Sequence, residues 1–139
     1  MHGCAVHGVA QFQALGSTTH TLMTKPKLLL HIEGAVVLLT SCILYHQSHA
    51  SWGWFALLFL TPDFSMLGYV TDKKLGATIY NVFHTYSVPL IIYVVLWFTG
   101  QTSYTWLLLI WIAHIAFDRL LGYGLKYDTA FKDTHFNQV

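Results

Sequence analysis

The sequence predicts an all-α fold: a polytopic membrane protein in which four transmembrane helices form an antiparallel bundle. The first observation is composition, because 55% of the 139 residues are hydrophobic and only 9% are charged. A soluble domain carries about 25% charged residues, so a soluble chain this apolar would expose large adhesive patches. The second observation is that apolar residues gather into segments close to the roughly 17–25 residues with which a helix crosses a bilayer.

Each of the four helices is predicted from one apolar segment. The segments cover residues 28–45, 52–67, 78–98 and 104–121. Backbone N–H and C=O groups must be hydrogen-bonded inside lipid, so each segment is expected to be helical. The short links HQSHAS, GYVTDKKLGA and TGQTS make consecutive helices antiparallel neighbours. We expect residues 27–124 to form this transmembrane domain, residues 1–26 a flexible N-terminal tail and residues 125–139 a cytoplasmic C-terminal tail.

Lysine and arginine lie on one side of the predicted bundle, the side of both chain termini. They are Lys25, Lys27, Lys73, Lys74, Arg119, Lys126 and Lys132. The links on the opposite side, residues 46–51 and 99–103, have none. The positive-inside rule therefore predicts a multi-pass protein of the plasma (inner) membrane with both termini cytoplasmic. The opposite side carries residues that fit an interfacial aromatic belt: Tyr45, Trp52, Trp54, Trp97, Tyr104 and Trp106.

Charge and motif content argue against several classes of function. The formal net charge is +1 and the basic residues are scattered, so no nucleic-acid partner is expected. The chain has no G-x-S-x-G, Walker A or dinucleotide-binding fingerprint, which leaves serine-hydrolase, P-loop and Rossmann functions without support. Cys4 and Cys42 share no motif spacing, and no disulfide is predicted.

Ionisable residues of the four predicted helices share one membrane depth. Glu33 lies about a turn and a half into the first helix, and Asp63 about one turn before the end of the second. His84 lies in the first two turns of the third helix. His114 and Asp118 lie in the last two turns of the fourth, four residues apart and therefore on one face. Because the helices alternate in direction, all of these side chains reach the cytoplasmic third of the membrane.

A divalent cation would account for this convergence. Histidine and carboxylate side chains from several helices are the ligands of metal sites in bundle cores, and the ion would neutralise the buried carboxylates. The predicted ligands are Glu33, Asp63, His84, His114, Asp118 and His135. His135, in the FKDTH motif, would fold back from the C-terminal tail as a lid. Zinc, iron and manganese remain open as the metal.

A metal-free polar network is the alternative interpretation. His84 and His114 would then hydrogen-bond across the bundle. Glu33 would pair with His31, Lys27 or Arg119, and Asp63 would cap a helix end next to Pro62, which frees a backbone carbonyl. A proton or ion path through the same groups is a third interpretation.

Several motifs point to a known family. FALLFLTPDFSMLGY, GATIYNVFHTYSVP, WIAHIAFDRLLGYGLKY and FKDTH occur in this order between about Leu28 and His135. Together they resemble the bacterial domain-of-unknown-function family 4260. Its members are small integral membrane proteins, so the resemblance implies a polytopic membrane protein, and it implies no activity. The chain departs from the family pattern before Lys25 and in its final THFNQV, where the family usually has Leu-Gly after the histidine.

Three classes of function fit these features. A metal-dependent enzyme, either a hydrolase or an oxidase, would act on a lipid-like small molecule near the cytoplasmic interface. An ion or proton carrier would use the acidic and histidine residues as a relay, and would need a homo-oligomer to form a pore. An accessory or structural subunit would pack its aromatic residues against partner membrane subunits. The enzyme is the main hypothesis and the subunit is the second.

Overall fold

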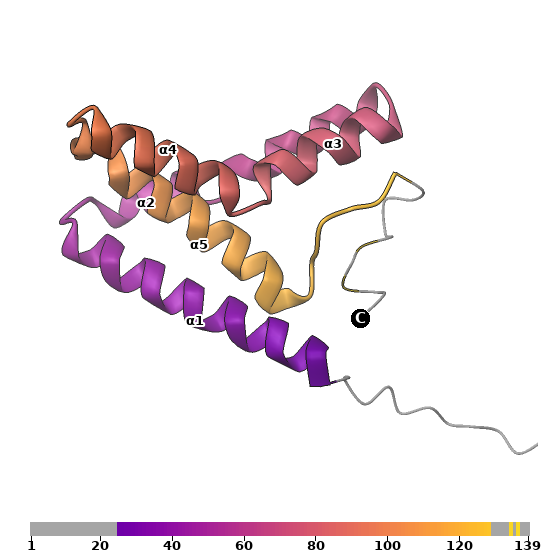
Figure 1. Cartoon of the computed structure of the whole chain (residues 1–139), viewed down its shortest axis with the longest axis horizontal. Helices are drawn as coiled ribbons and strands as arrows, with labels where there is room; N and C mark the ends of the chain where they lie inside the picture. The colour runs from indigo at the N-terminus through magenta and orange to yellow at the C-terminus, as the bar shows by residue number, and fades with distance from the viewer. Residues whose placement is uncertain (1–24, 129–133, 135, 137–139) are drawn as a thin grey trace, which may run out of the picture.

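The computed structural model describes residues 25–128, 134 and 136 of the chain. This part is helical and contains no β-strand (Figure 1), which confirms the predicted all-α class. The elements in chain order are α1 (Lys25–Gln47), α2 (Trp52–Leu58), η1 (Thr61–Val70), α3 (Lys73–Phe83), α4 (Ser87–Phe98), η2 (Thr102–Tyr104) and α5 (Thr105–Leu121). The residues expected to form the N-terminal tail, up to residue 24, lie outside the described residues, and so does most of the C-terminal tail.

Several stretches of helix are long and apolar enough to cross a membrane. By length and composition there are three among the described residues: Pro26–Gln47, Trp52–Val70 and Thr102–Leu121. The helices α3 and α4 make a fourth if the pair counts as one span, although they are bent by 47° relative to each other. The described chain therefore has three or four candidate membrane-spanning segments.

The second predicted helix is not one continuous α-helix. The helix α2 ends at Leu58, and the chain continues as the 3₁₀-helix η1. Pro62 lies in the first turn of η1, where its missing N–H leaves the carbonyl of Leu58 without an α-helical partner. The hydroxyl of Thr61 donates to that carbonyl at 2.6 Å instead. The proline therefore causes a change of helix type without ending the span.

The third predicted helix begins earlier than expected and is broken. It starts at Lys73, because the carboxylate of Asp72 accepts hydrogen bonds from the two backbone N–H groups of Lys74 and Leu75. It ends at Phe83, and α4 starts at Ser87 with Pro89 in its first turn. A proline ring clashes with the carbonyl four residues before it, so the chain has to restart its helix there. His84 lies in this break.

The helices α1 and α5 pack along each other over much of their length (Figure 1). A glycine allows the close approach: a Cβ atom added to Gly34 would lie 2.7 Å from the backbone nitrogen of Leu120 and 2.9 Å from the carbonyl oxygen of Ala116. Near the other end of α1, Tyr45 is fully buried and its hydroxyl donates to the carbonyl of Ser51 at 2.6 Å. Tyr45 therefore packs inside the protein.

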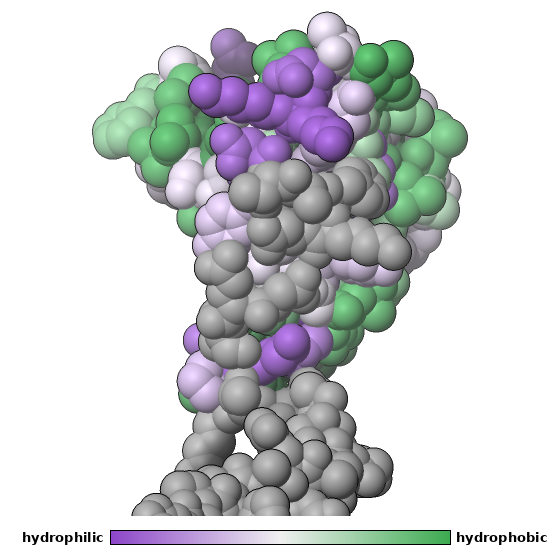
Figure 2. All heavy atoms as spheres, turned by 90° about the vertical axis from the view of Figure 1, so that its right-hand side faces the viewer, coloured by the Kyte–Doolittle hydropathy of each residue, from purple (hydrophilic) through white to green (hydrophobic). Residues whose placement is uncertain are grey.

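Hydrophilic surface gathers at one end of the molecule. Figure 2 shows this end, which is on the right in Figure 1, with polar surface where η1 turns into α3 and hydrophobic surface on both sides. The exposed residues at this turn are Thr71, Asp72, Lys73 and Lys74. Exposed apolar side chains elsewhere include Leu39, Leu57, Phe64 and Ile91, each at least 59% exposed. This distribution suits a protein whose sides face lipid.

Candidate metal centre

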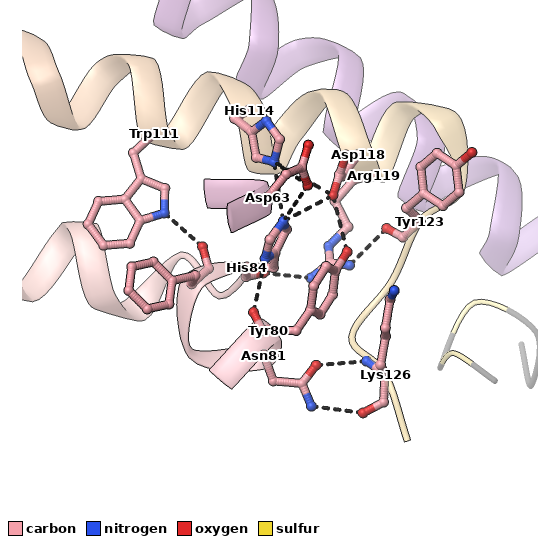
Figure 3. A network of polar contacts seen from close by, with 11 residues as sticks. Asp63, Tyr80, Asn81, His84, Trp111, His114, Asp118, Arg119, Tyr123 and Lys126 are labelled. Carbon is pink, nitrogen blue, oxygen red and sulfur yellow. Dashed lines mark hydrogen bonds and ion pairs between the residues drawn. The ribbon is translucent and has the colours of Figure 1, made fainter. Parts of the chain in front are cut away.

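Four side chains from different parts of the sequence meet between the helices (Figure 3). They are Asp63 in the first turn of η1, His84 just after α3, and His114 and Asp118 on α5. Each offers one ligand atom, and these four atoms lie within 4.8 Å of one another. We refer to these four residues as the His/Asp cluster. Four of the six residues proposed from the sequence as metal ligands thus lie together.

The spacing of the ligand atoms fits a small cation. The Nε2 atoms of His84 and His114 are 3.2 Å apart. The Oδ1 atom of Asp63 lies 3.4 Å from Nε2 of His84 and 3.5 Å from Nε2 of His114. The Oδ2 atom of Asp118 lies 3.5 Å and 4.0 Å from the same two nitrogen atoms. In a tetrahedral zinc site with bonds of about 2.0–2.1 Å, ligand atoms are about 3.3–3.4 Å apart. The four shorter separations are close to this value, and the distance between His114 and Asp118 is wider.

The backbone of α3 fixes the orientation of His84. Its Nδ1 atom lies 2.9 Å from the carbonyl oxygen of Tyr80, one turn earlier. A carbonyl oxygen only accepts hydrogen bonds, so Nδ1 carries the hydrogen atom and donates it. In the neutral ring, Nε2 then has a lone pair that points at the centre of the cluster. Metal-bound histidines in proteins are held in the same way, by a hydrogen bond from the nitrogen that does not bind the ion.

Tyr80 supports two members of the cluster. Its ring stacks on the imidazole of His84, with centroids 3.8 Å apart and an interplanar angle of 11°. Its hydroxyl donates to Oδ2 of Asp118 at 3.2 Å. Sequence reasoning did not identify this residue. The signal was present, because Tyr80 precedes His84 by four residues and therefore shares its helix face.

His114 is held by packing. It is 1% exposed, and the ring of Phe59 meets it edge to face with centroids 5.4 Å apart. Its Nδ1 atom is buried and has no hydrogen-bond partner among the described residues. Without an ion, its Nε2–H can donate to Nε2 of His84; with an ion, both Nε2 atoms can bind it through their lone pairs. The metal-free network and the metal site therefore use the same two nitrogen atoms.

Exposure differs within the cluster. The side chains of His84 and His114 are 1% exposed and that of Asp118 is 13% exposed, whereas that of Asp63 is 39% exposed. Three of the four side chains are therefore mostly buried, and Asp63 is the most accessible of them. Water or another small molecule would reach the cluster on the side of Asp63.

Two basic residues, Arg119 and Lys126, lie next to residues of the cluster or their supports. The guanidinium of Arg119 donates to the backbone carbonyls of His84 at 3.1 Å and of Tyr123 at 2.9 Å (Figure 3). The ammonium of Lys126 lies 4.3 Å from the centre of the Tyr80 ring. Burial lowers the pKa of Lys126, while the carboxylates of Asp118 and Asp63 oppose that shift.

Asn81, on α3, is not a member of the His/Asp cluster and binds the chain segment that follows α5. It shares a helix turn with His84, but its amide binds the backbone of Lys126. It donates to the carbonyl of Lys126 at 2.8 Å and accepts from the N–H of Lys126 at 2.7 Å. This pair of hydrogen bonds, which we call the Asn81 clamp, attaches the C-terminal segment to α3.

The remaining predicted ligands are not in the His/Asp cluster. Glu33 is exposed on α1, lies outside the four-residue group, and has no hydrogen bond or ion pair with another described residue. Its suggested partner His31 instead contacts the carbonyl of Leu120 through Nδ1 at 2.7 Å. His135, proposed as a lid, lies outside the described residues.

The fold and the site define a class: an all-helical protein with candidate membrane-spanning helices and a buried cluster of two histidines and two aspartates. The chain belongs to the family described as Domain of unknown function (DUF4260), whose sequence profile matches residues 27–139. This match includes the whole His/Asp cluster and confirms the resemblance seen in the sequence motifs. No curated protein and no solved structure matches the chain.

Proposed function

We propose that this protein is a four-span membrane protein that binds a divalent transition-metal ion at the His/Asp cluster and uses it to hydrolyse a lipid-like substrate. The observation that carries the proposal is that two imidazole nitrogens and two carboxylate oxygens, brought from three separate parts of the chain, lie within 4.8 Å of one another. Carboxylates packed this closely repel each other and are costly to bury, and a divalent ion offsets both effects.

The membrane arrangement is part of the proposal. The three long apolar stretches and the bent pair α3–α4 supply four crossings, with the third crossing broken at His84. Broken transmembrane helices are typical of binding sites, because the break exposes backbone groups and side chains to a ligand. The lysine and arginine distribution gives both termini a cytoplasmic location.

The difference in exposure within the cluster supports catalysis over a purely structural role. Catalytic zinc sites have three protein ligands and one accessible position, whereas structural sites are closed. His84, His114 and Asp118 would hold the ion, and Asp63 lies at the accessible side. An ion in this place would lower the pKa of a bound water, and Asp63 would accept the proton of that water as it attacks the substrate.

The surroundings of Asp63 favour a substrate with an apolar part. Leu60 and Phe64, which are close to Asp63 in the sequence, are 59% and 69% exposed, so accessible apolar side chains lie on the same stretch of chain as Asp63. A lipid-like molecule could place its apolar part against these residues and its polar group at the cluster. Iron bound by the same ligands would support oxidation instead, and the identity of the metal separates these two reactions.

Elemental analysis tests the metal site directly. Protein purified in detergent without a histidine tag is expected to contain about one zinc, iron or manganese ion per chain. His84→Ala and His114→Ala should each remove the metal. His46→Ala, at an exposed histidine in the last turn of α1, is the control and should leave the metal in place. Folded, monodisperse protein that binds no metal even after incubation with each of these ions would show that the cluster is a metal-free polar network.

A further inference from the structure

Arg119 is a partly exposed cation that forms no ion pair with a carboxylate among the described residues. Its guanidinium donates only to two backbone carbonyls, those of His84 and Tyr123. A guanidinium has five N–H donors in a planar fork. The two hydrogen bonds use one N–H of Nη1 and one of Nη2, so Nε, Nη1 and Nη2 each have one N–H left for another acceptor. The charge is close to the cluster, since the guanidinium lies 3.1 Å from the backbone carbonyl oxygen of His84, a member of the cluster.

Metal binding would change the charge balance at this position. Without an ion, the positive charge of Arg119 partly compensates the carboxylate of Asp118, and the nearby carboxylate of Asp63 adds a second negative charge. A divalent ion would neutralise both carboxylates and leave Arg119 without a compensating negative charge. An uncompensated charge is unfavourable where water is partly excluded, so the loaded site would favour an anion that contacts both the ion and the guanidinium.

We propose that the metal-loaded cluster binds a phosphate group between the ion and Arg119, an inference that rests on the proposed metal function. Phosphate oxygens are good ligands for divalent ions, and Arg pairs with phosphate through two parallel hydrogen bonds. Tyr86, the residue before α4, interacts electrostatically with both Arg119 and Asp118. The substrate class of the proposed hydrolase is therefore a phosphate ester.

The location of Arg119 allows two sources for this phosphate. Arg119 lies in the last turn of α5, two residues before the end of the candidate span Thr102–Leu121. The end of a span is at the level of lipid headgroups, where the phosphates of membrane lipids lie. A lipid phosphate would approach from within the membrane interface, whereas a soluble phosphate ester would approach from the aqueous side.

Thermodynamic linkage between metal and phosphate tests the inference in the wild-type chain. The affinity for Zn²⁺ is measured in detergent by competition with a chromophoric chelator, with and without phenyl phosphate and with acetate at matched ionic strength. Phenyl phosphate should lower the apparent Kd for Zn²⁺ by about fivefold or more, and acetate should not. A chain that binds none of the candidate metals contradicts the proposed metal function itself. A chain that binds zinc with an affinity unchanged by phenyl phosphate, or changed equally by acetate, contradicts the phosphate site alone.

Reconstituted membranes distinguish the two sources. Zinc affinity is compared in nanodiscs of phosphatidylcholine alone and in nanodiscs that also contain phosphatidic acid, whose headgroup is a phosphate monoester. Tighter zinc binding with phosphatidic acid, and no further effect of added phenyl phosphate, supports the lipid source. An effect of phenyl phosphate alone supports the soluble source, and an effect of neither contradicts the site.

Variants of Arg119 test whether this residue is responsible for the effect of phosphate on zinc affinity. Arg119→Gln should keep zinc bound but reduce the phosphate effect to less than twofold, and Arg119→Lys should retain part of it because the charge remains. Lys74→Gln, at an exposed residue, is the matched control and should behave as wild type. Zinc content measured on each purified variant shows whether the cluster has survived. A full phosphate effect in zinc-loaded Arg119→Gln protein would contradict the role of Arg119, and the wild-type linkage remains decisive if that variant does not fold.

Discussion

The Nδ1 atom of His84 donates a hydrogen bond of 2.9 Å to the backbone carbonyl of Tyr80. This one contact determines that Nε2, with its lone pair, faces the carboxylates of Asp63 and Asp118. His84 is the residue that follows α3, and the same carbonyl also accepts its backbone N–H at 2.9 Å. Two hydrogen bonds to one carbonyl therefore hold this candidate ligand, and the side-chain bond sets its tautomer.

Tyr80→Phe should weaken metal binding without removing it. The substitution keeps the ring that stacks on His84 but deletes the hydroxyl that donates to Asp118 at 3.2 Å. Groups that orient metal ligands typically contribute about 10- to 100-fold in affinity, so the apparent Kd for Zn²⁺ should rise by about that factor. Chelator competition on purified protein measures it. Tyr93→Phe, at an exposed tyrosine of α4, is the control, and equal affinities of the two variants would contradict a supporting role for the Tyr80 hydroxyl.

Most of the fold could be predicted from the sequence because apolar segments of membrane length allow little except helices. The predicted helix at residues 104–121 differs from α5 by one residue at its start. The errors occurred where a local contact overrides hydropathy. Asp72 starts α3 within a polar link, and the prolines at positions 62 and 89 interrupt segments that are uniformly apolar. Hydropathy describes the average environment of a segment and does not register these single contacts.

The site was predictable in part, for a related reason. Depth along each helix placed five ionisable residues at one level, and four of them do meet. Depth alone does not specify which way a side chain faces around its helix, and this is why Glu33 was included although it is exposed. Tyr80 and the Asn81 clamp were missed because their roles depend on contacts with Asp118 and Lys126, which are 38 and 45 residues away in the sequence.

Gly34→Ala should destabilise the packing of α1 against α5. The added Cβ would lie 2.7 Å from the backbone nitrogen of Leu120, and backbone atoms of a packed helix cannot move aside cheaply. We expect a loss of about 1–3 kcal/mol in the free energy of unfolding, seen as a lower Tm by circular dichroism in detergent. Gly53→Ala is the control, because its Cβ would meet only the Ser51 hydroxyl, at 3.4 Å. An unchanged Tm for Gly34→Ala would mean that the two helices are further apart than described.

Substitutions of Asn81 should release the C-terminal segment from α3. Asn81→Ala removes both hydrogen bonds of the Asn81 clamp, and Asn81→Asp keeps an acceptor for the Lys126 N–H while losing the donor to the Lys126 carbonyl. A buried hydrogen-bonding group left unpaired costs about 1–3 kcal/mol. Hydrogen exchange at the Lys126 amide should therefore accelerate strongly in Asn81→Ala and less in Asn81→Asp.

The matched control for the Asn81 clamp is Thr78→Ala. Thr78 is exposed on the same helix, and its hydroxyl bonds only the carbonyl of Lys74 within α3. Exchange at Lys126 should stay at the wild-type rate in this variant. Wild-type exchange in Asn81→Ala as well would show that the segment is held by other contacts.

Cysteine labelling should place the η1–α3 turn in the cytoplasm and the α4–α5 link outside it. The turn carries Lys73 and Lys74, whereas residues 99–103 contain no charged side chain, so the positive-inside rule assigns them to opposite sides. In a chain whose two native cysteines are replaced by serine, Gln101→Cys should react with a membrane-impermeant maleimide in intact bacteria. Lys74→Cys should react only after the membrane is permeabilised; both positions are exposed, so accessibility within the protein does not limit either reaction. The reverse pattern would invert the proposed topology. Labelling of both positions in intact cells would place them on the same side and contradict a membrane crossing by the pair α3–α4.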